Sequence, residues 1–382
     1  MINVTKPFLP PAEEYQEYLR QIWQLNWLTN NGPLVNELEL KLKDELDLEH
    51  LLFLSNGTIA LQIAFKALRL TGEVITTPFS YVATTSSLVW EGLKPVFVDI
   101  DSRTLNIDVN KIEAAITSDT SAILATHVYG NPCEIDKLEA LGKKYGLEII
   151  YDAAHCFGTT YKEKSVFGYG DISTCSFHAT KVFHTIEGGA VFSNNPDTIS
   201  NMSRLRNFGH DGPGKFTGAG INGKNSEFHA AMGLTNLKYI EDILATRKRQ
   251  YLTYVQKLKN LEVDFLEINP DAGFNYAYCP IIFKSEEVLL ASVKALNEHY
   301  IFPRRYFYPS LNHLDYVEEK ECPIAEDVSS RVLCLPLFHD LSSSSIELIS
   351  RILLRTQRYQ FPQKVPAGVV VKPNGRLTTQ HA

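Results

Sequence analysis

The chain of 382 residues carries a net charge of −7, with 44% hydrophobic and 21% charged residues. Its length exceeds that of a usual single core, so we expect one large domain with a smaller one attached. The negative charge, without a long Lys/Arg cluster, argues against a nucleic acid partner, and no apolar run approaches the ~20 residues of a membrane span.

The amino-terminal residues and the cysteines indicate a cytoplasmic protein. Residues 1–7 lack the apolar stretch of a signal peptide. The six cysteines are widely separated and show no C-x-x-C spacing, so the sequence predicts neither a metal site nor a dense disulfide framework. Reduced cysteines in a cytoplasmic enzyme fit this pattern.

The first part of the chain predicts two helices and then a turn that could hold an anion. Acidic and apolar residues recur at helical spacing over 11–28, and a second helix is expected over 34–46. The apolar strand 51–54 gives way at Ser55-Asn-Gly-Thr58 to another helix. Free backbone N–H groups and the helix dipole both face such a turn, which therefore favours an anion.

Further apolar segments predict the strands of one sheet. Most are separated by helical segments, such as 81–91 and 133–145. Strands that alternate with helices indicate a mainly parallel sheet covered on both faces. The strands are expected at 73–77, 95–99, 122–127, 148–151 and 173–176. We therefore predict an α/β fold whose large domain spans residues 1–240.

Two residues that follow the last two predicted strands are candidates for a catalytic role. Lys181 lies in a short, largely apolar and hydroxyl-bearing segment, 176–189, which two glycines close. Loss of solvation there lowers the pKa of an ammonium, so the neutral amine can attack a carbonyl and form a Schiff base. Asp152 ends an apolar strand, where ligands bind in open α/β sheets and where a pyridinium nitrogen could find its partner. Alternatively, Lys181 could extend its amine from the end of a strand into solvent, and Asp152 could cap the N-terminus of a helix.

The remaining chain predicts a smaller α+β domain over residues 241–360. A polar loop with several glycines runs to Gly233, and a long charged helix follows at 237–258. A strand at 276–283 and a helix at 288–299 come next.

Two segments of this part remain open to more than one interpretation. The arginines and tyrosines of 304–308 could border a substrate pocket or form a packed turn. The tail, 361–382, carries no core pattern and is expected to be flexible.

Short motifs along the chain stand in the order and at the spacing of a known family. They are Trp27-Leu-Thr-Asn-Asn-Gly-Pro33, Ser55-Asn-Gly-Thr58, Pro78-Phe-Ser-Tyr-Val-Ala-Thr84, Pro95-Val-Phe-Val-Asp-Ile-Asp101, Tyr151-Asp-Ala-Ala-His155, residues 176–189 and Gly220-Ile-Asn222. From about Thr5 to about Leu354 the chain resembles the DegT/DnrJ/EryC1/StrS sugar aminotransferases. The resemblance implies the fold of the aspartate aminotransferase-like enzymes, fold type I, and pyridoxal 5'-phosphate as cofactor.

The resemblance also implies roles around that cofactor. Lys181 would hold it as a Schiff base, and Asp152 would face its pyridine nitrogen. Gly57 and Thr58, joined by the hydroxyl of Ser176, would contact its phosphate.

Other residues complete the implied site. Tyr81 would stack on the cofactor ring, although a lone tyrosine is more often a core residue. His155 stands where the family commonly has glutamine, and either side chain can hydrogen-bond the ring oxygen. Asn222 would reach across a homodimer to the partner's phosphate. Lys224 replaces a more usual arginine and would grip an anion as a point charge.

The substrate would be held remotely, through its diphosphate and base. Lys224, Arg304 and Arg305 offer positive charge for the diphosphate, and Tyr306 and Tyr308 offer aromatic faces for the base or sugar.

The reaction implied is transfer of an amino group, from L-glutamate, to C-4 of dTDP-4-keto-6-deoxyglucose. The product would be dTDP-4-amino-4,6-dideoxyglucose, for a surface polysaccharide such as the O-antigen of lipopolysaccharide. The alternatives are a GDP- or UDP-linked keto-sugar (perosamine-type or 3-amino-sugar), or a nucleotide-sugar-binding relative without transaminase activity. The presence of Lys181 favours transfer over the last of these.

Overall fold

The computed structural model describes residues 1–361, 369–371 and 377–379. Its helices are α1 Ala12–Leu25, α2 Pro33–Leu46, α3 Gly57–Ala67, α4 Val82–Trp90, α5 Val109–Ile112, α6 Ile135–Tyr145, α7 Pro196–Leu205, α8 Glu227–Leu237, α9 Ile240–Lys257, α10 Glu286–Asn297, α11 Pro323–Arg331 and α12 Ser343–Gln360. Its strands are β1 Ile2–Asn3, β2 Leu51–Leu54, β3 Glu73–Thr76, β4 Lys94–Phe97, β5 Thr120–Thr126, β6 Glu148–Asp152, β7 Thr160–Tyr161, β8 Lys164–Ser165, β9 Ile172–Ser176, β10 Gly189–Phe192, β11 Val263–Phe265, β12 Ala272–Gly273, β13 Cys279–Phe283, β14 Ile301–Phe302, β15 Val332–Leu335, β16 Val369–Val371 and β17 Leu377–Thr379.

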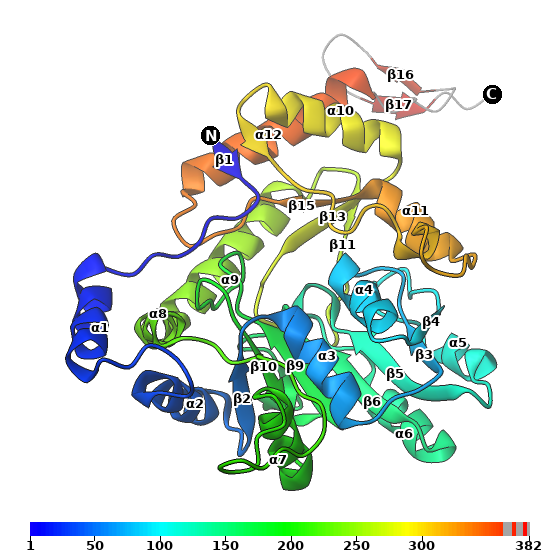
Figure 1. Cartoon of the computed structure of the whole chain (residues 1–382). Coiled ribbons are helices and arrows are strands. Elements are labelled where there is room, and N and C mark those ends of the chain that lie inside the picture. Colours follow the sequence, from blue (N-terminus) through cyan, green and yellow to red (C-terminus); the bar gives the residue numbers. More distant parts are fainter. Residues whose placement is uncertain (362–368, 372–376, 380–382) are drawn as a thin grey trace.

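A seven-stranded sheet forms the centre of the molecule (Figure 1). Its strand order is β2-β10-β9-β6-β5-β3-β4. The pairs among β4, β3, β5, β6 and β9 are parallel, while β10 runs antiparallel to both of its neighbours. The sheet is therefore mainly parallel, and the carboxyl ends of β5, β6 and β9 lie at one edge.

Helices cover both faces of this sheet, as the burial of alternate strand residues shows. Ile149 and Tyr151 of β6 pack in one cluster with residues of α2, α6 and α8. Ile150 packs on the opposite face, in a cluster that includes residues of α3 and α4. Because side chains along a strand point to opposite faces in turn, the strands are buried on both sides. The predicted α/β class is confirmed.

Local sequence signals fix where several of these helices begin and end. Asn56 caps α3, its side chain accepting a hydrogen bond from the N–H of Ile59 at 2.8 Å. Pro33 starts α2 at a position where the missing N–H is not needed. Gly146 ends α6 in the left-handed conformation, with φ +66°, which glycine adopts without strain.

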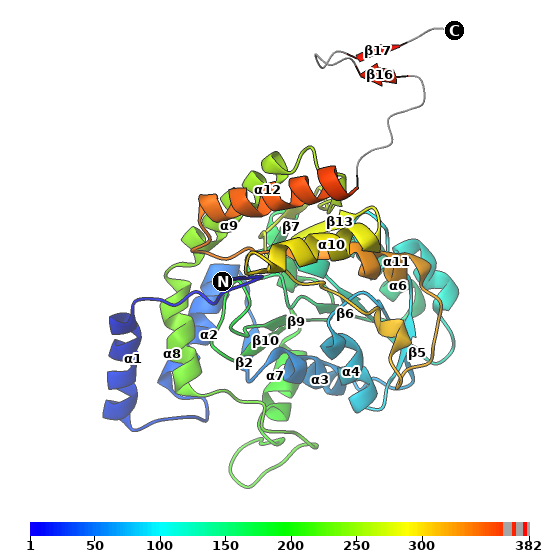
Figure 2. The same cartoon turned by 90° about the horizontal axis from the view of Figure 1, so that it is seen from above.

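A smaller antiparallel sheet lies beside the large one, in the order β11-β13-β15. Its hydrophobic cluster includes Tyr254 of α9, Leu289 of α10 and Ile349 of α12. Figures 1 and 2 show α10 and α12 on the side of this sheet that faces away from the large sheet. The first residues of the chain join this region, because β1 pairs in parallel with β14. The predicted domains at 1–240 and 241–360 stay a prediction.

Two expectations from the sequence need correction. The helix expected at 237–258 is found as α9, Ile240–Lys257, but a separate helix, α8, already begins at Glu227, inside the segment expected to be a loop up to Gly233. Gly233 lies inside α8, where an added Cβ would meet Leu38 of α2 at 2.9 Å, so this glycine serves close helix packing. Strand β10 was not expected at all. The prediction for the tail, 361–382, falls largely outside the described residues.

Candidate active site

A cavity of about 630 Å³ opens at the carboxyl ends of the central strands. It lies between this edge of the large sheet and the segment that follows β14, as expected for ligands of open α/β sheets. The predicted site residues that line it are Gly57, Thr58, Tyr81, Asp152, His155, Ser176, Lys181, Arg304 and Tyr306. The fold therefore brings together residues that stand far apart in the sequence.

Lys181 enters this cavity from the loop between β9 and β10. Backbone hydrogen bonds close the loop: Phe177 N–H donates to Gly188 at 2.8 Å, and Ala179 N–H donates to Ile186 at 2.8 Å. Phe183, just after the lysine, is buried in the core. Within the described residues the Lys181 amine makes no hydrogen bond or ion pair. Burial lowers its pKa, while the charge of Asp152 opposes that shift.

Asp152 is the last residue of β6 and is buried, with 6% of its surface exposed. Its Oδ2 accepts a hydrogen bond from the Thr84 hydroxyl at 2.6 Å, and its Oδ1 accepts one from the N–H of Ala154 at 3.2 Å. Burial raises the pKa of this carboxyl group, while these two hydrogen bonds and Lys181 lower it. A carboxylate in this position favours a cationic partner in the cavity.

His155 lies beside Asp152 with an unsatisfied ring nitrogen. Its Nδ1 is buried and has no hydrogen-bond partner in the described part of the chain. The imidazole stacks on Phe307, with ring centroids 5.8 Å apart and planes at 8°. Burial lowers the pKa of His155 well below its ordinary value, and Lys181 adds to this shift, so the ring is neutral. A buried polar atom in a cavity wall indicates a ligand group that would satisfy it.

The turn before α3 forms a close-packed cradle at the other end of the cavity. An added Cβ on Gly57 would meet the Ser176 Cβ at 3.0 Å, and one on Gly189 would meet the Asn56 carbonyl carbon at 2.5 Å. The first N–H groups of a helix have no acceptor within it, and here the Asn56 side chain satisfies only that of Ile59. The remaining N–H groups and the Ser176 hydroxyl suit a phosphate.

These features fit pyridoxal phosphate, the cofactor expected from the sequence. The cradle suits its phosphate, Asp152 suits a pyridinium nitrogen, and the free Nδ1 of His155 suits a ring oxygen. The unpaired amine of Lys181 suits its aldehyde. No group of three or more His, Cys, Asp or Glu that could hold a metal ion occurs in the part of the chain that the structure describes.

Arg304 and Tyr306 line the cavity, but the other two predicted residues of this segment do not. The Arg305 guanidinium donates to Glu286 Oε1 at 2.7 Å and to the carbonyl of Ser330 at 2.8 Å. It also lies over the ring of Tyr308, 3.6 Å from the centroid. Arg305 and Tyr308 thus pack on one another away from the cavity, whereas Arg304 is exposed at it.

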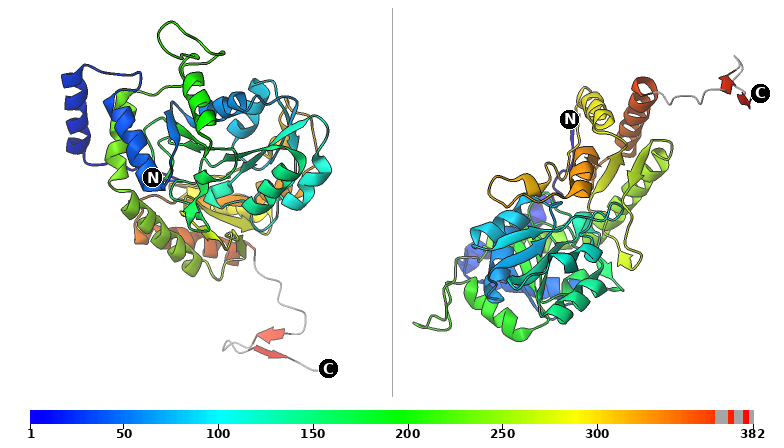
Figure 3. Two further views of the ribbon diagram at one scale, coloured as in Figure 1. Left: turned by 90° about the horizontal axis from the view of Figure 1, so that it is seen from below. Right: turned by 90° about the vertical axis from the view of Figure 1, so that its right-hand side faces the viewer.

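Asn222 and Lys224 lie outside the cavity of their own chain. Both belong to the segment between α7 and α8, part of which projects from the molecule (Figure 3). Asn222 is exposed. Lys224 is 9% exposed and donates to Asn207 Oδ1 at 2.7 Å. Burial lowers its pKa, and Arg206 adds to this shift.

Several residues of the cavity escaped the sequence analysis. Ser80 and Thr84 belong to a motif that was recognised, yet only Tyr81 received a role there. Thr126 ends β5, next to Asp152 in the sheet register. Its place at the end of a predicted strand was the available signal. Residues 3–5 also line the cavity, and nothing in their sequence indicated this.

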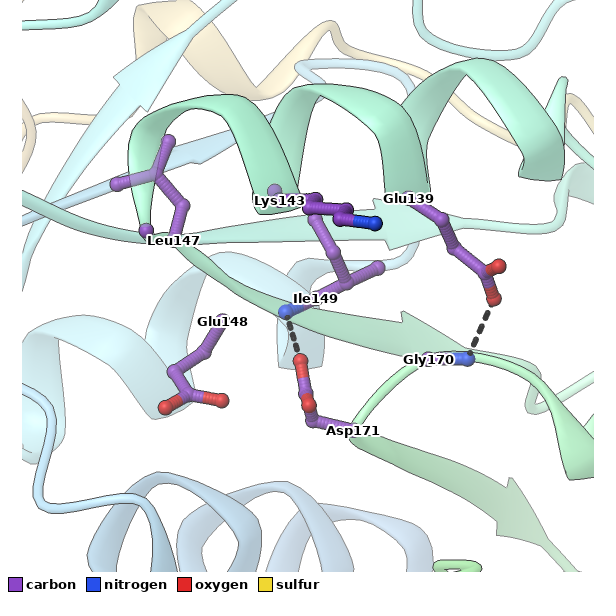
Figure 4. A pocket seen from close by; sticks show the side chains of 9 residues that line it. Glu139, Lys143, Leu147, Glu148, Ile149, Gly170 and Asp171 are labelled. Atoms are coloured by element: carbon purple, nitrogen blue, oxygen red, sulfur yellow. Dashed lines mark hydrogen bonds between the residues drawn. The ribbon is translucent and has the colours of Figure 1, made fainter.

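A second cavity, of about 470 Å³, lies at the opposite end of β6 (Figure 4). Two of the carboxylates that line it already accept hydrogen bonds from the backbone: Asp171 accepts from the N–H of Ile149 at 2.7 Å, and Glu139 accepts from the N–H of Gly170 at 3.1 Å. It lies at the amino ends of the strands, so the cavity that holds Lys181 is the better candidate. Within the described residues, no helix has the length and apolarity to cross a membrane.

Comparisons with known proteins show the family to which this chain belongs. A family model described as the DegT/DnrJ/EryC1/StrS aminotransferase family matches residues 11–353. The chain is 45% identical over 355 residues to the dTDP-4-amino-4,6-dideoxy-D-glucose transaminase of Shigella dysenteriae (91% of this chain, 97% of the relative) and 41% identical over 365 residues to that of Escherichia coli (92% and 98%). The crystal structure of DesI in the presence of its TDP-sugar product aligns with a TM-score of 0.89 at 32% identity, covering 94% of this chain and 93% of DesI. The chain therefore belongs to the DegT/DnrJ/EryC1/StrS aminotransferase family.

Proposed function

We propose that this aminotransferase moves an amino group from L-glutamate to C-4 of dTDP-4-keto-6-deoxyglucose. The product is dTDP-4-amino-4,6-dideoxyglucose, a building block for surface polysaccharide such as O-antigen. Membership in the family implies pyridoxal phosphate as the cofactor. The observation that carries the proposal is a free amine, that of the half-buried Lys181, in one cavity with the Asp152 carboxylate and a phosphate cradle.

The chain's own residues have distinct tasks in this reaction. When bound, pyridoxal phosphate supplies an aldehyde carbon that carries the amino group and a ring that accepts electrons. Asp152 holds the ring nitrogen in its protonated form by its negative charge. Lys181, whose pKa is lowered by burial, can take a proton from the amino donor in one half-reaction and give a proton to the sugar carbon in the other. His155 and Tyr81 orient the ring from its edge and its face.

The sugar nucleotide is proposed from the relatives and from the mouth of the cavity. The relatives from Shigella dysenteriae and Escherichia coli are named for a dTDP-sugar, and the structure of DesI was determined in the presence of its TDP-sugar product. The exposed guanidinium of Arg304 lines the cavity and makes no ion pair within the described residues. It can therefore meet a diphosphate, while Tyr306 offers an aromatic face.

The choice of sugar nucleotide can be tested by a half-reaction. The enzyme loaded with pyridoxamine phosphate is expected to react with dTDP-4-keto-6-deoxyglucose about tenfold faster or more than with GDP- or UDP-linked 4-keto-sugars. Stopped-flow absorbance of the cofactor follows each reaction, and NMR of the product locates the new amine. Faster reaction with a GDP- or UDP-linked ketone, or amination at C-3, would refute the substrate while leaving the aminotransferase assignment intact.

We further propose that the enzyme works as a homodimer in which Asn222 serves the partner's cofactor phosphate. Asn222 is exposed and absent from the cavity of its own chain. Large apolar side chains of α1, of the residues after it and of the segment between α7 and α8 are also exposed, and exposed apolar side chains favour a protein interface. They are Trp23, Trp27, Leu28, Phe208 and Ile221.

Mixing two variants tests this arrangement. Asn222→Ala and Lys181→Ala subunits are each expected to give poorly active dimers. Hybrid dimers hold one site with both residues intact, so a random mixture should regain roughly a quarter of the wild-type activity. Native mass spectrometry verifies that the hybrids form.

A matched control mixes Lys181→Ala with Asp152→Asn subunits. Both of these residues serve the cofactor of their own chain, so no hybrid site is complete and no activity should return. Equal recovery in the two mixtures, or a fully active monomer in light scattering, would overturn the role of Asn222.

A further inference from the structure

Three buried hydroxyl groups form a chain that ends on Asp152. The Thr84 hydroxyl donates to Asp152 Oδ2 at 2.6 Å. Ser80 Oγ lies 2.7 Å from Thr84 Oγ1, and the Thr126 hydroxyl donates to Ser80 Oγ at 3.2 Å. All four side chains line the same cavity, from the segment before α4, from α4 itself and from the ends of β5 and β6.

The direction of these hydrogen bonds is fixed by the number of protons. A hydroxyl group has one hydrogen to donate. Thr84 gives its hydrogen to the carboxylate, so Ser80 must donate to Thr84, and Ser80 in turn accepts from Thr126. Each donor points toward Asp152, which is the arrangement that an ionised carboxylate favours.

Burial makes this chain of hydroxyls difficult to replace. Ser80 and Thr126 are 2% exposed, and Thr84 is fully buried. Water cannot readily take over a lost hydrogen bond there, and hydrogen bonds in series strengthen one another in a medium of low dielectric. The sheet register sets Thr126 beside Asp152, so the first and last members are held by neighbouring strands.

We propose that Thr84, oriented by Ser80 and Thr126, is a positioning residue for the reaction. It fixes Asp152 Oδ2 and stabilises the charged carboxylate, so that the proton shared with the cofactor stays on the ring nitrogen. This inference rests on the proposed role of Asp152 in the aminotransferase. Without the Thr84 hydroxyl, the carboxyl group takes that proton and the ring nitrogen loses it.

The charges around Asp152 show why the hydroxyl matters. Burial raises the pKa of Asp152, which favours the neutral acid. The groups that face it are the Lys181 amine and the thiols of Cys156 and Cys175. Burial raises the pKa of both thiols, so they stay neutral and add no charge. The Thr84 hydroxyl, the N–H of Ala154 and Lys181 are thus what oppose protonation of Asp152.

Replacing Thr84 by valine removes the hydroxyl at nearly constant shape. In the holoenzyme loaded with cofactor labelled with ¹⁵N in its ring, we expect the ratio of protonated to unprotonated nitrogen to fall about tenfold in Thr84→Val. The ¹⁵N chemical shift measures this ratio directly. The kcat of transfer should fall with it, while the KM for the sugar nucleotide stays unchanged. Thr84→Ser, which keeps the hydroxyl, should restore the wild-type shift.

Thr85 provides a matched control in the same helix. It is also fully buried, but its hydroxyl has no partner in the described part of the chain, and it does not line the cavity. Thr85→Val should therefore leave the nitrogen shift unchanged. If Thr84→Val does not hold the cofactor, Ser80→Ala, which removes the donor behind Thr84, should show a smaller shift in the same direction.

The outcomes separate this inference from the proposed function. A changed nitrogen shift in Asp152→Asn, with wild-type shifts in Thr84→Val and Ser80→Ala, would overturn the inference and leave the role of Asp152 intact. A wild-type shift in Asp152→Asn would overturn the proposed role itself. Equal effects of Thr84→Val and Thr85→Val would show that packing alone is responsible, which also contradicts the inference.

Discussion

Replacement of Lys181 by methionine is expected to reduce amino transfer by about four orders of magnitude or more. Lys181 is the one lysine among the described residues that line the cavity, so no other amine can take its place there. Borohydride treatment of the wild-type enzyme with pyridoxal phosphate should attach the cofactor irreversibly to Lys181, and peptide mass mapping identifies the residue. The Lys181→Met protein should remain unlabelled.

Lys143→Met is a suitable control for this experiment. Lys143 is exposed and lines the other cavity, at the amino end of β6 (Figure 4). Its replacement should preserve both activity and the label. A label on any other lysine, or full activity of Lys181→Met, would contradict the assignment.

The same substitution should change stability in a defined direction. Because burial lowers the pKa of Lys181, the folded apoenzyme binds fewer protons than the unfolded chain between that lowered pKa and the ordinary lysine value. The free energy of unfolding therefore rises as the pH rises through this window and is reduced below it. Methionine removes this partly desolvated charge, so the apoenzyme of Lys181→Met should melt at a higher temperature than the wild-type apoenzyme at neutral pH.

The sequence predicts most of the large sheet because its strands obey simple rules. Residues 148–151, mainly apolar, follow the predicted helical segment 133–145, and β6 was found there. Strand β10 follows β9 without an intervening helix, and this is possible because it runs antiparallel to β9. The rule of alternating strands and helices therefore missed β10. The omission matters, since the connection from β9 to β10 is the loop that carries Lys181.

The candidate site was predictable where a residue's position at a strand end fixes its place in the cavity. Asp152 follows from this rule, and Lys181 follows from its apolar segment and its distance from Asp152. The chain of hydroxyls could not be predicted from the sequence, because the alignment of Thr126 with Asp152 depends on the sheet register. The orientation of the Arg305 side chain could not be predicted from the sequence either, because it is set by hydrogen bonds to Glu286 and to the carbonyl of Ser330.

Replacement of Asp152 by asparagine is expected to lower amino transfer by about two to three orders of magnitude while cofactor binding is partly retained. Asparagine carries no negative charge, so the ring nitrogen is no longer kept protonated and the ring accepts electrons poorly. Single-turnover absorbance measures the loss, and a dialysis titration measures binding of the cofactor. Normal transfer by Asp152→Asn would contradict the role of this carboxylate.

The stability of the apoenzyme gives an independent check on the same residue. Because burial raises the pKa of Asp152, the folded chain binds more protons than the unfolded chain between the ordinary carboxyl value and that raised pKa. The free energy of unfolding therefore falls as the pH rises through this window and stays lower above it. Asp152→Asn removes this charge and should raise the melting temperature of the apoenzyme at neutral pH.

Asp99 is the contrasting control. Its carboxylate is also buried, but it accepts hydrogen bonds from the N–H groups of Ile324 at 3.1 Å and Ala325 at 2.9 Å, away from the cavity. Asp99→Asn weakens those bonds and should lower the melting temperature. Opposite shifts in the two variants would show that Asp152 holds its charge for the cofactor at the expense of the fold, and a lower melting temperature in both would assign Asp152 a structural role instead.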